Sequence, residues 1–211
     1  MAGRLLDTEL LKVFDEQGNH IGEATRAEVH RLGLWHEAFH CWFIGKEKEI
    51  DYIYLQLRSS DKDFYPNLYD ITAAGHLLAH ETVADGVREI NEELGIDVAM
   101  EELIPLGVIP YCVENEEIID NERAHVYLYR TNHSFDDFTL QKEEVSGMIR
   151  VPFNLFEELW LGNREQVPIE GFKILPNGSR ITILEKTHKK QFVQHVPNYY
   201  EKVLGAIKSH L

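Results

Sequence analysis

The chain has 211 residues, of which 44% are hydrophobic and 27% are charged, a composition typical of one main globular domain. Its 36 acidic and 21 basic side chains give a formal net charge of -15, which repels nucleic-acid backbones and anionic membrane surfaces. No apolar run approaches the roughly 20 residues that span a bilayer. We therefore expect a cytoplasmic protein that binds neither nucleic acid nor membranes.

The first half of the chain predicts a hairpin, a helix and several strands. Residues 11–24 form the hairpin, around a turn-prone segment at 16–19. A helix follows, because Thr25 and Glu28 have the spacing of a capping box and Gly33 can end the helix in a left-handed conformation. Strands are predicted at 36–44 and 51–58 around a charged turn at 45–49, and a short strand at 69–74 after a polar loop. The segment 51–58 alternates between two faces.

The second half predicts further strands between helices. Residues 83–94 are helical by periodicity, and Gly95 ends that helix. Strands are predicted at 104–113, 124–131 and 145–151, an apolar helix at 153–160, a hairpin around 174–181 and a terminal helix at 196–210. Helices and strands alternate irregularly, so we expect an α+β fold of the α/β/α sandwich type. Cys41 and Cys112 lie in apolar, strand-like runs, and both are interpreted as buried free thiols.

Three carboxylates are concentrated in the predicted helix at 83–94. Glu89, Glu92 and Glu93 are three and four residues apart, so they share one helix face. Like charges at this spacing repel one another, and a divalent cation would offset the repulsion. Mg²⁺ prefers such oxygen ligands. A solvated acidic surface is the alternative for this helix taken alone.

The flanking residues favour the metal site, because the segment resembles the Nudix box. That motif is a Gly, five residues, a Glu, seven residues, and then Arg-Glu-apolar-any-Glu-Glu-any-Gly-apolar. The matching residues are Gly75, Glu81, Arg88, Glu89, Ile90, Glu92, Glu93, Gly95 and Ile96. This chain departs from the motif at one point, since six residues separate Glu81 from Arg88. In the family this Glu and Arg commonly hold the loop–helix–loop together, so the departure puts their pairing in question.

The resemblance covers roughly residues 10–160, and segments 14–18, 57–66 and 70–75 look like the Nudix subgroup close to isopentenyl-diphosphate isomerase. It implies an α/β/α sandwich with a mixed sheet, formed by residues 1–165. Residues 166–211 are then a hairpin-and-helix extension packed on the same domain. The implied cofactor is Mg²⁺, with Mn²⁺ as the alternative, bound by Glu89, Glu92 and Glu93.

Isomerases of that subgroup use a Cys just before the box Gly and a Glu on a later strand. Here Ala74 occupies the Cys position, which removes the thiol that handles the proton. Other parts of the isomerase pattern are kept, namely His36, His76, the Asp120-Asn121-Glu122 triplet and, with a slightly different spacing, His30. Two imidazoles and two carboxylates would suit Mn²⁺, Zn²⁺ or Fe²⁺. Local hydrogen bonding of each His is the alternative interpretation.

We expect a hydrolase that cleaves a diphosphate linkage in a nucleoside-diphosphate derivative or a related organic diphosphate. The candidate catalytic residues are Arg88, Glu92, Glu93 and Glu122, and the candidate metal ligands are Glu89, Glu92, Glu93, His36 and His76. Arg58, Lys62 and Gly75 are candidates for contact with the diphosphate, although Arg58 and Lys62 also fit solvated charges.

Some assignments stay open at this point. A later Glu can serve as general base, the candidates being Glu114, Glu116, Glu117, Glu143 and Glu144. An isomerase-like enzyme with Glu122 as the acid/base group, and a catalytically inactive Nudix-fold ligand sensor, are the alternatives to the hydrolase. A homodimer is compatible with the sequence.

Overall fold

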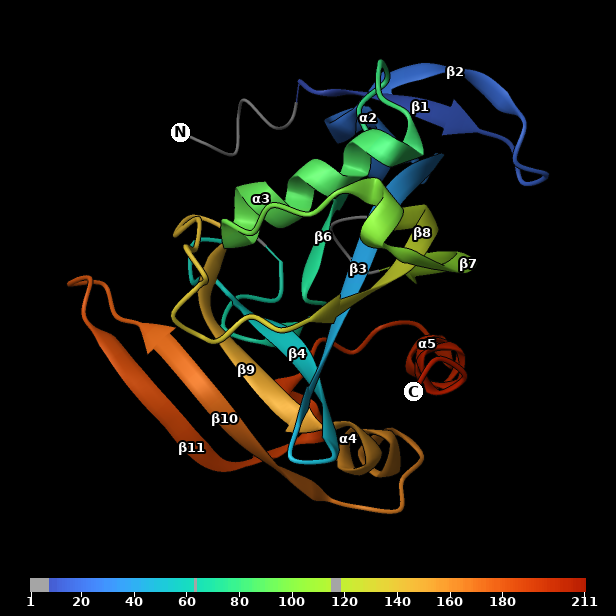
Figure 1. Ribbon diagram of the computed structural model, residues 1–211. Helices are drawn as coiled ribbons and strands as arrows, with labels where there is room; N and C mark the ends of the chain where they lie inside the picture. The colour runs from blue at the N-terminus through green and yellow to red at the C-terminus, as the bar shows by residue number, and fades with distance from the viewer. Residues whose placement is uncertain (1–7, 63, 115–118) are drawn as a thin grey trace.

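The computed structural model describes residues 8–62, 64–114 and 119–211. Figure 1 shows the chain from β1 to the C-terminal helix. The strands are β1 (Leu10–Phe14), β2 (His20–Thr25), β3 (Trp35–Glu47), β4 (Ile50–Arg58), β5 (Tyr69–Asp70), β6 (Ala73–His76), β7 (Ile104–Glu114), β8 (Ile119–Thr131), β9 (Val145–Pro152), β10 (Gln166–Ile174) and β11 (Arg180–His188). The α-helices are α2 (Arg26–Leu32), α3 (Arg88–Leu94), α4 (Phe153–Trp160) and α5 (Tyr199–Lys208), and the 3₁₀ helices are η1 (Val83–Val87), η2 (Met100–Glu102) and η3 (Lys189–Gln191).

The strands form one mixed sheet with β3 near its centre. The main path runs β11-β10-β9-β4-β3-β1-β2, and β6 and β8 also pair with β3. The β3–β8 pair is parallel, whereas the other pairs are antiparallel. One hydrophobic core lies between the sheet and α3, and a second lies between the sheet and helices α4 and α5, as Figure 1 shows. The architecture is the α/β/α sandwich that the sequence predicts.

Strand β4 contributes to both cores. Ile53, Leu55 and Leu57 belong to the core under α4 and α5, whereas Tyr54 belongs to the core under α3. Successive side chains of a strand point to opposite faces, so the predicted alternation is confirmed. Gln56 shares the face of Tyr54 and is buried, which places a polar side chain beneath α3.

Before the Nudix box, the structure differs from the sequence prediction in a strand and in a turn. The predicted strand at 69–74 is two strands, because β5 pairs with β4 and β6 pairs with β3. Thr72 lies at the crossing, where its hydroxyl donates to the Tyr54 carbonyl at 2.5 Å and accepts from the Phe43 amide at 3.0 Å. The turn predicted at 45–49 contains only Lys48 and Glu49, whose φ angles of 47° and 66° suit a two-residue hairpin turn.

The two cysteines have different surroundings. Cys41 is buried, and burial raises the pKa of its thiol well above the ordinary value. Cys112 is exposed, so the expectation of a second buried thiol is wrong. Among the described strands β7 pairs with β8 alone, and its side chains alternate, so Tyr111 faces the core and Cys112 faces outward.

The chain beyond residue 165 contributes to the same sheet and core as the rest. β10 pairs with β9, β11 pairs with β10, and the first turn of α5 buries Tyr199 and Tyr200 in the core beside α4. The predicted hairpin is confirmed with longer strands, and the terminal helix is shorter than predicted. In the described parts of the chain, every helix is too short or too polar to cross a membrane.

Candidate active site

The loop and helix that carry the three carboxylates lead from β6 to Gly95. Residues Val83–Val87 are a 3₁₀ helix and only Arg88–Leu94 are α-helical, so the predicted single helix is wrong in its first turn. A 3₁₀ helix rises about 2.0 Å per residue and an α-helix about 1.5 Å, so five residues of the former span about as far as seven of the latter. A 3₁₀ segment therefore spans more distance per residue in the part of the box that is one residue short.

Arg88 joins the loop to the helix through three carboxylates. Its Nε donates to Glu81 Oε1 at 2.5 Å and its Nη2 to Glu81 Oε2 at 3.0 Å. Its Nη1 donates to Glu89 at 2.6 Å and to Glu92 at 3.0 Å, and Nη2 also reaches the His76 carbonyl at 3.2 Å. The pairing that the shortened box put in question is present, with the two-pronged geometry that makes Arg–carboxylate pairs strong.

Glu89 lies directly against Gly75. A Cβ built at Gly75 would be 2.2 Å from Glu89 Cδ, so position 75 has no room for any side chain. Burial raises the pKa of Glu89 to about 7, although the Arg88 guanidinium opposes the rise. The box glycine is therefore explained by the close approach of this carboxylate to the strand.

Glu93 is the most deeply buried of the three carboxylates. Strand β3 pairs with β6 over Ala38–Cys41 and with β4 over Phe43–Glu47, and Glu93 lies where these two partners separate. Its Oε2 accepts from Gln56 Nε2 at 3.2 Å and from the Ala74 amide at 3.1 Å. Burial, with the neighbouring Glu89 charge, raises the pKa of Glu93 well above its ordinary value. Glu92, by contrast, has 52% of its side chain exposed.

These carboxylates suit a hard divalent cation. Burial raises the pKa of both Glu89 and Glu93, and the Glu89 charge raises that of Glu93 further, so each favours its protonated form when no cation is present. A bound Mg²⁺ or Mn²⁺ would replace those protons, and oxygen donors are what such ions prefer. The donor type therefore suits the cation that the sequence predicts, although in this structure Arg88 holds Glu89 and Glu92, and Gln56 and the Ala74 amide hold Glu93.

A second group of candidate ligands lies on the opposite face of the sheet. His36 on β3, His76 on β6, Asp120 on β8 and His30 on α2 each offer one ligand atom, and these atoms lie within 4.8 Å of one another. His36 Nε2 is 3.5 Å from Asp120 Oδ1, and both atoms are buried without a hydrogen-bond partner. Buried polar atoms without partners are costly, and a metal ion would satisfy them.

Two imidazoles of this histidine cluster, those of His36 and His76, favour the neutral form, which is the form that binds a metal. Burial lowers the pKa of His36 and lowers that of His76 to about 3. Glu122 lies beside them, with Oε1 3.5 Å from His76 Nε2 and Oε2 3.3 Å from His40 Nε2. His36, His76 and Glu122 thus lie together, and their roles as metal ligands and acid/base group stay predictions.

Of the three residues predicted to contact the diphosphate, the basic Arg58 and Lys62 both have partners within the chain, and Gly75 lies against Glu89. Arg58 donates to Asp70 Oδ2 at 2.9 Å and to the Phe64 carbonyl. Lys62 pairs with Glu144, which immediately precedes β9. Of the two basic residues, Lys62 lies near the α3 carboxylates. Its charge lowers the pKa of Glu93, and the charge of Glu144 raises it.

Sequence reasoning left Gln56 without a role and did not single out Glu144 among the five general-base candidates. Gln56 is a buried polar side chain in an alternating strand, and that alternation is the signal from which it could have been found. Glu144 gave no signal, because its place beside Glu93 depends on strand pairing far along the chain. Of the other general-base candidates, Glu143 is exposed, and Glu116 and Glu117 lie outside the described residues.

Comparison with known proteins decides the family. No protein family model matches the chain. An uncharacterized Nudix hydrolase of Clostridium acetobutylicum is 36% identical over 202 residues, which cover 96% of this chain and 98% of that protein. The chain belongs to the Nudix hydrolase family.

Other Nudix proteins and an isomerase are also similar to this Nudix chain. Nudix hydrolase 3 of Arabidopsis thaliana is 38% identical over 69% of this chain and 19% of that protein. The isopentenyl-diphosphate Δ-isomerase of Aliivibrio fischeri is 34% identical over 67% of this chain and 78% of that enzyme. A crystal structure from Deinococcus radiodurans has a TM-score of 0.55 at 16% identity, covering 74% of this chain and 91% of that one. A MutT/nudix protein of Enterococcus faecalis has a TM-score of 0.50 at 12% identity, covering 82% of this chain and 60% of that one. At these identities the two structures support the fold alone.

Proposed function

We propose that this Nudix family member uses Mg²⁺ or Mn²⁺ to hydrolyse the diphosphate linkage of a nucleoside-diphosphate derivative or a related organic diphosphate. The observation that carries the proposal is the arrangement of α3. Glu89, Glu92 and Glu93 share one face of this short helix, and Arg88 fixes the helix to the preceding loop through Glu81. Three carboxylates held together in this way make sense as cation ligands.

Each residue of the site has a separate role in the proposed hydrolysis. A bound cation would neutralise the diphosphate charge and activate the attacking water. Glu89 and Glu93 offer buried oxygens as ligands, and Arg88 keeps Glu89 and Glu92 in place. Glu92 or Glu93 accepts the proton of the water, and Glu144, held by Lys62, is a third candidate for this step.

Substitution of the helix carboxylates tests this proposal. Glu92→Gln and Glu93→Gln should each lower turnover at least about 100-fold and leave the fold intact, because cation and base act mainly in the transition state. The assay separates by chromatography the products formed from nucleoside diphosphates, dinucleotides, nucleotide sugars and coenzyme A with Mg²⁺ and then Mn²⁺, because cleavage of an internal diphosphate gives two phosphate monoesters. Glu101→Gln, on an exposed Glu of η2, is the control. Full activity in both helix variants would contradict the assignment.

An isomerase-like activity is the second candidate, and the histidine cluster beside Glu122 favours it. Moving the double bond of an alkene needs a proton donor and an acceptor on opposite sides of the carbon skeleton. Ala74 occupies the position of the usual thiol and can supply neither. We therefore expect hydrolysis without isomerisation.

This expectation is tested by incubating the protein with isopentenyl diphosphate and Mg²⁺ and following the product by NMR. Dimethylallyl diphosphate formed without cleavage of any member of the diphosphate panel would reverse the order of the two candidates. The absence of both reactions would favour the ligand sensor.

A further inference from the structure

The start of α5 reaches across the core to the face of the sheet that carries Glu122. Tyr199 is 1% exposed, and its hydroxyl lies 2.7 Å from His40 Nδ1, a contact between residues 159 positions apart. The other nitrogen of this ring, Nε2, lies 3.3 Å from Glu122 Oε2. The remaining oxygen of Glu122 faces His76 Nε2 at 3.5 Å. One continuous row of polar contacts therefore joins the C-terminal helix to the histidine cluster.

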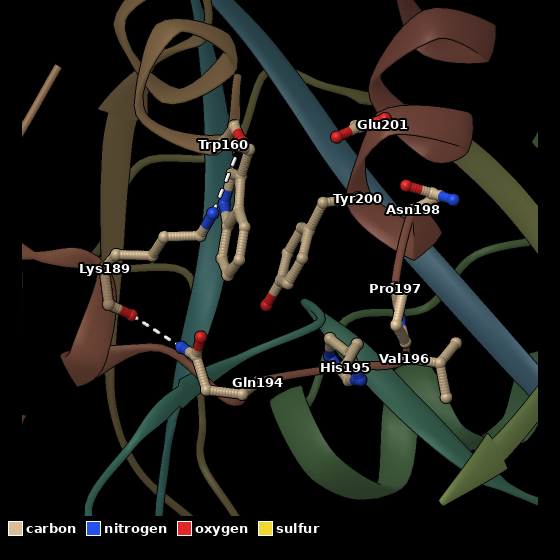
Figure 2. A pocket seen from close by; sticks show the side chains of 9 residues that line it. All are labelled: Trp160, Lys189, Gln194, His195, Val196, Pro197, Asn198, Tyr200 and Glu201. Carbon is tan, nitrogen blue, oxygen red and sulfur yellow. Dashed lines mark hydrogen bonds between the residues drawn. The ribbon is translucent and has the colours of Figure 1, made fainter. Parts of the chain in front are cut away.

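The segment before Tyr199 is fixed at a second point. His195 Nε2 lies 2.9 Å from Asp70 Oδ1, and His195 Nδ1 lies 2.9 Å from the Tyr111 hydroxyl. Figure 2 shows the neighbouring Tyr200 ring between Trp160 and His195, stacked on Trp160 with ring centroids 3.5 Å apart. Trp160, His195 and Tyr200 line a pocket of about 290 Å³ that contains none of the predicted site residues. The contacts of His195 and Tyr200 leave the neighbouring Tyr199 little freedom to move away from His40.

The contact with Tyr199 decides which way the His40 ring presents its proton. Burial raises the pKa of the Tyr199 hydroxyl well above its ordinary value, so Tyr199 is a neutral phenol that can donate. If His40 is neutral, Nδ1 accepts this hydrogen bond and Nε2 carries the ring proton. If His40 is charged, both nitrogens carry protons. With Glu122 ionised, its Oε2 can only accept, so in either state Nε2–H points to Glu122.

Glu122 depends on that donor. Each of its two buried oxygens faces one imidazole nitrogen, Oε2 facing His40 Nε2 at 3.3 Å and Oε1 facing His76 Nε2 at 3.5 Å. A carboxylate held from both sides keeps a fixed orientation, and partners behind a ligand are known to set ligand orientation. Loss of the His40 donor would release one oxygen of Glu122 and disturb His76.

We propose that Tyr199 is a positioning residue of the active site, which orients Glu122 and His76 through His40. The C-terminal extension then completes the histidine cluster. This proposal depends on the proposed function in one respect, which is the assignment of Glu122 and His76 to the active site. The hydrogen-bond arrangement itself exists whether or not a diphosphate is hydrolysed.

The matched variants are Tyr199→Phe and Tyr200→Phe. Each removes one buried hydroxyl from the first turn of α5, but the Tyr200 hydroxyl donates to the Val193 carbonyl at 3.0 Å and does not contact His40. Ring ¹⁵N spectra of the histidine-labelled, metal-free protein report the tautomer of each imidazole, and His40→Gln identifies the His40 signals among the eleven histidines.

Three results are expected. Wild-type His40 carries a proton on Nε2, Tyr199→Phe mixes its tautomers and shifts the His76 signals, and Tyr200→Phe changes neither. Turnover, if measurable, falls about 10-fold in Tyr199→Phe alone. A wild-type His40 protonated on Nδ1 alone, an unchanged His40 in Tyr199→Phe, or unmoved His76 signals would each overturn the proposal. If the histidines respond as expected but no diphosphate is cleaved, the proposed function fails and the positioning role stands.

Discussion

At the scale of single residues, the two faces of the sheet favour different metal ions. The face under α3 presents carboxylate oxygens, with Glu89 and Glu93 buried and inclined to hold protons. The opposite face presents imidazoles that burial keeps neutral. Oxygen donors suit Mg²⁺ and Mn²⁺, whereas imidazoles suit Zn²⁺, Fe²⁺ and Mn²⁺, so we propose two metal sites of different preference.

Glu89 should make the stability of the cation-free protein depend on pH. Its folded-state pKa of about 7 lies above the ordinary 4.5, so its contribution to stability is complete below about pH 4.5 and is lost as pH rises through 7. The difference in unfolding free energy between wild type and Glu89→Gln should therefore fall by up to about 3 kcal/mol between pH 4.5 and 7.5. Denaturant titrations in EDTA measure it.

Saturating Mg²⁺ should reduce this pH dependence, because the cation provides the charge that the proton otherwise supplies. The control is Glu101→Gln, on an exposed residue of η2. A difference between wild type and Glu89→Gln that stays constant over this pH range would show that Glu89 is not protonated in the folded protein.

At the scale of elements, the loop–helix–loop shows what sequence patterns can and cannot predict. The helix at Thr25 and the end of α3 at Gly95 are determined within a few residues, and both were predicted correctly. The winding of η1 was missed, because apolar periodicity over so few residues does not separate a 3₁₀ helix from an α-helix. The pairing of Arg88 with Glu81 depends on that winding, which is why the sequence left it open.

Long-range pairing limited the prediction of the site in the same way. Glu93 contacts Gln56 only because β4 and β6 both pair with β3. His36 lies opposite Glu122 only because β3 and β8 pair in parallel. Periodicity within a strand carries no information on its partner, so the nearness of His36 to Glu122 was predicted through family resemblance and not from local pattern.

The Arg88 network should hold the loop to α3. Lys cannot reproduce the two-pronged bond to Glu81, so Arg88→Lys should lower the free energy of unfolding by about 1–3 kcal/mol. It should also speed amide exchange at Leu78, whose amide donates to Glu81 Oε2 at 2.7 Å. Hydrogen exchange followed by NMR or mass spectrometry measures the opening of this loop.

Arg164→Lys is the matched control, because Arg164 pairs with the partly exposed Glu158 and such surface pairs contribute little. Arg88→Lys should therefore differ from it in both readouts. Wild-type exchange at Leu78 in Arg88→Lys would mean that the loop is held by other contacts.

At the scale of the whole molecule, the histidine cluster draws its ligands from α2, β3, β6 and β8. These elements meet only after the sheet and α2 have assembled. A metal ion bound there would stabilise the folded chain over the unfolded one by mass action. The ion would also coordinate His36 Nε2 and Asp120 Oδ1, which are buried without a hydrogen-bond partner.

Zn²⁺ or Mn²⁺ should therefore raise the thermal midpoint of the wild-type protein, by an amount that grows with metal concentration. His36→Gln should lose most of this rise, whereas His188→Gln, on the exposed strand β11, should keep it. Differential scanning fluorimetry in chelated and metal-loaded protein measures both. An equal rise in the two variants would place the stabilising ion elsewhere.

The alternation of β6 has a consequence for how this chain can change during evolution. Gly75 makes room for Glu89 on one face, and the adjacent His76 faces the histidine cluster on the other. Inserting or deleting one residue in β6 would exchange the faces and place an imidazole against Glu89. Both sites would be lost together. Length changes here should therefore be rare in related chains, whereas the turn between β10 and β11, at the edge of the sheet where β11 pairs with β10, can accept them.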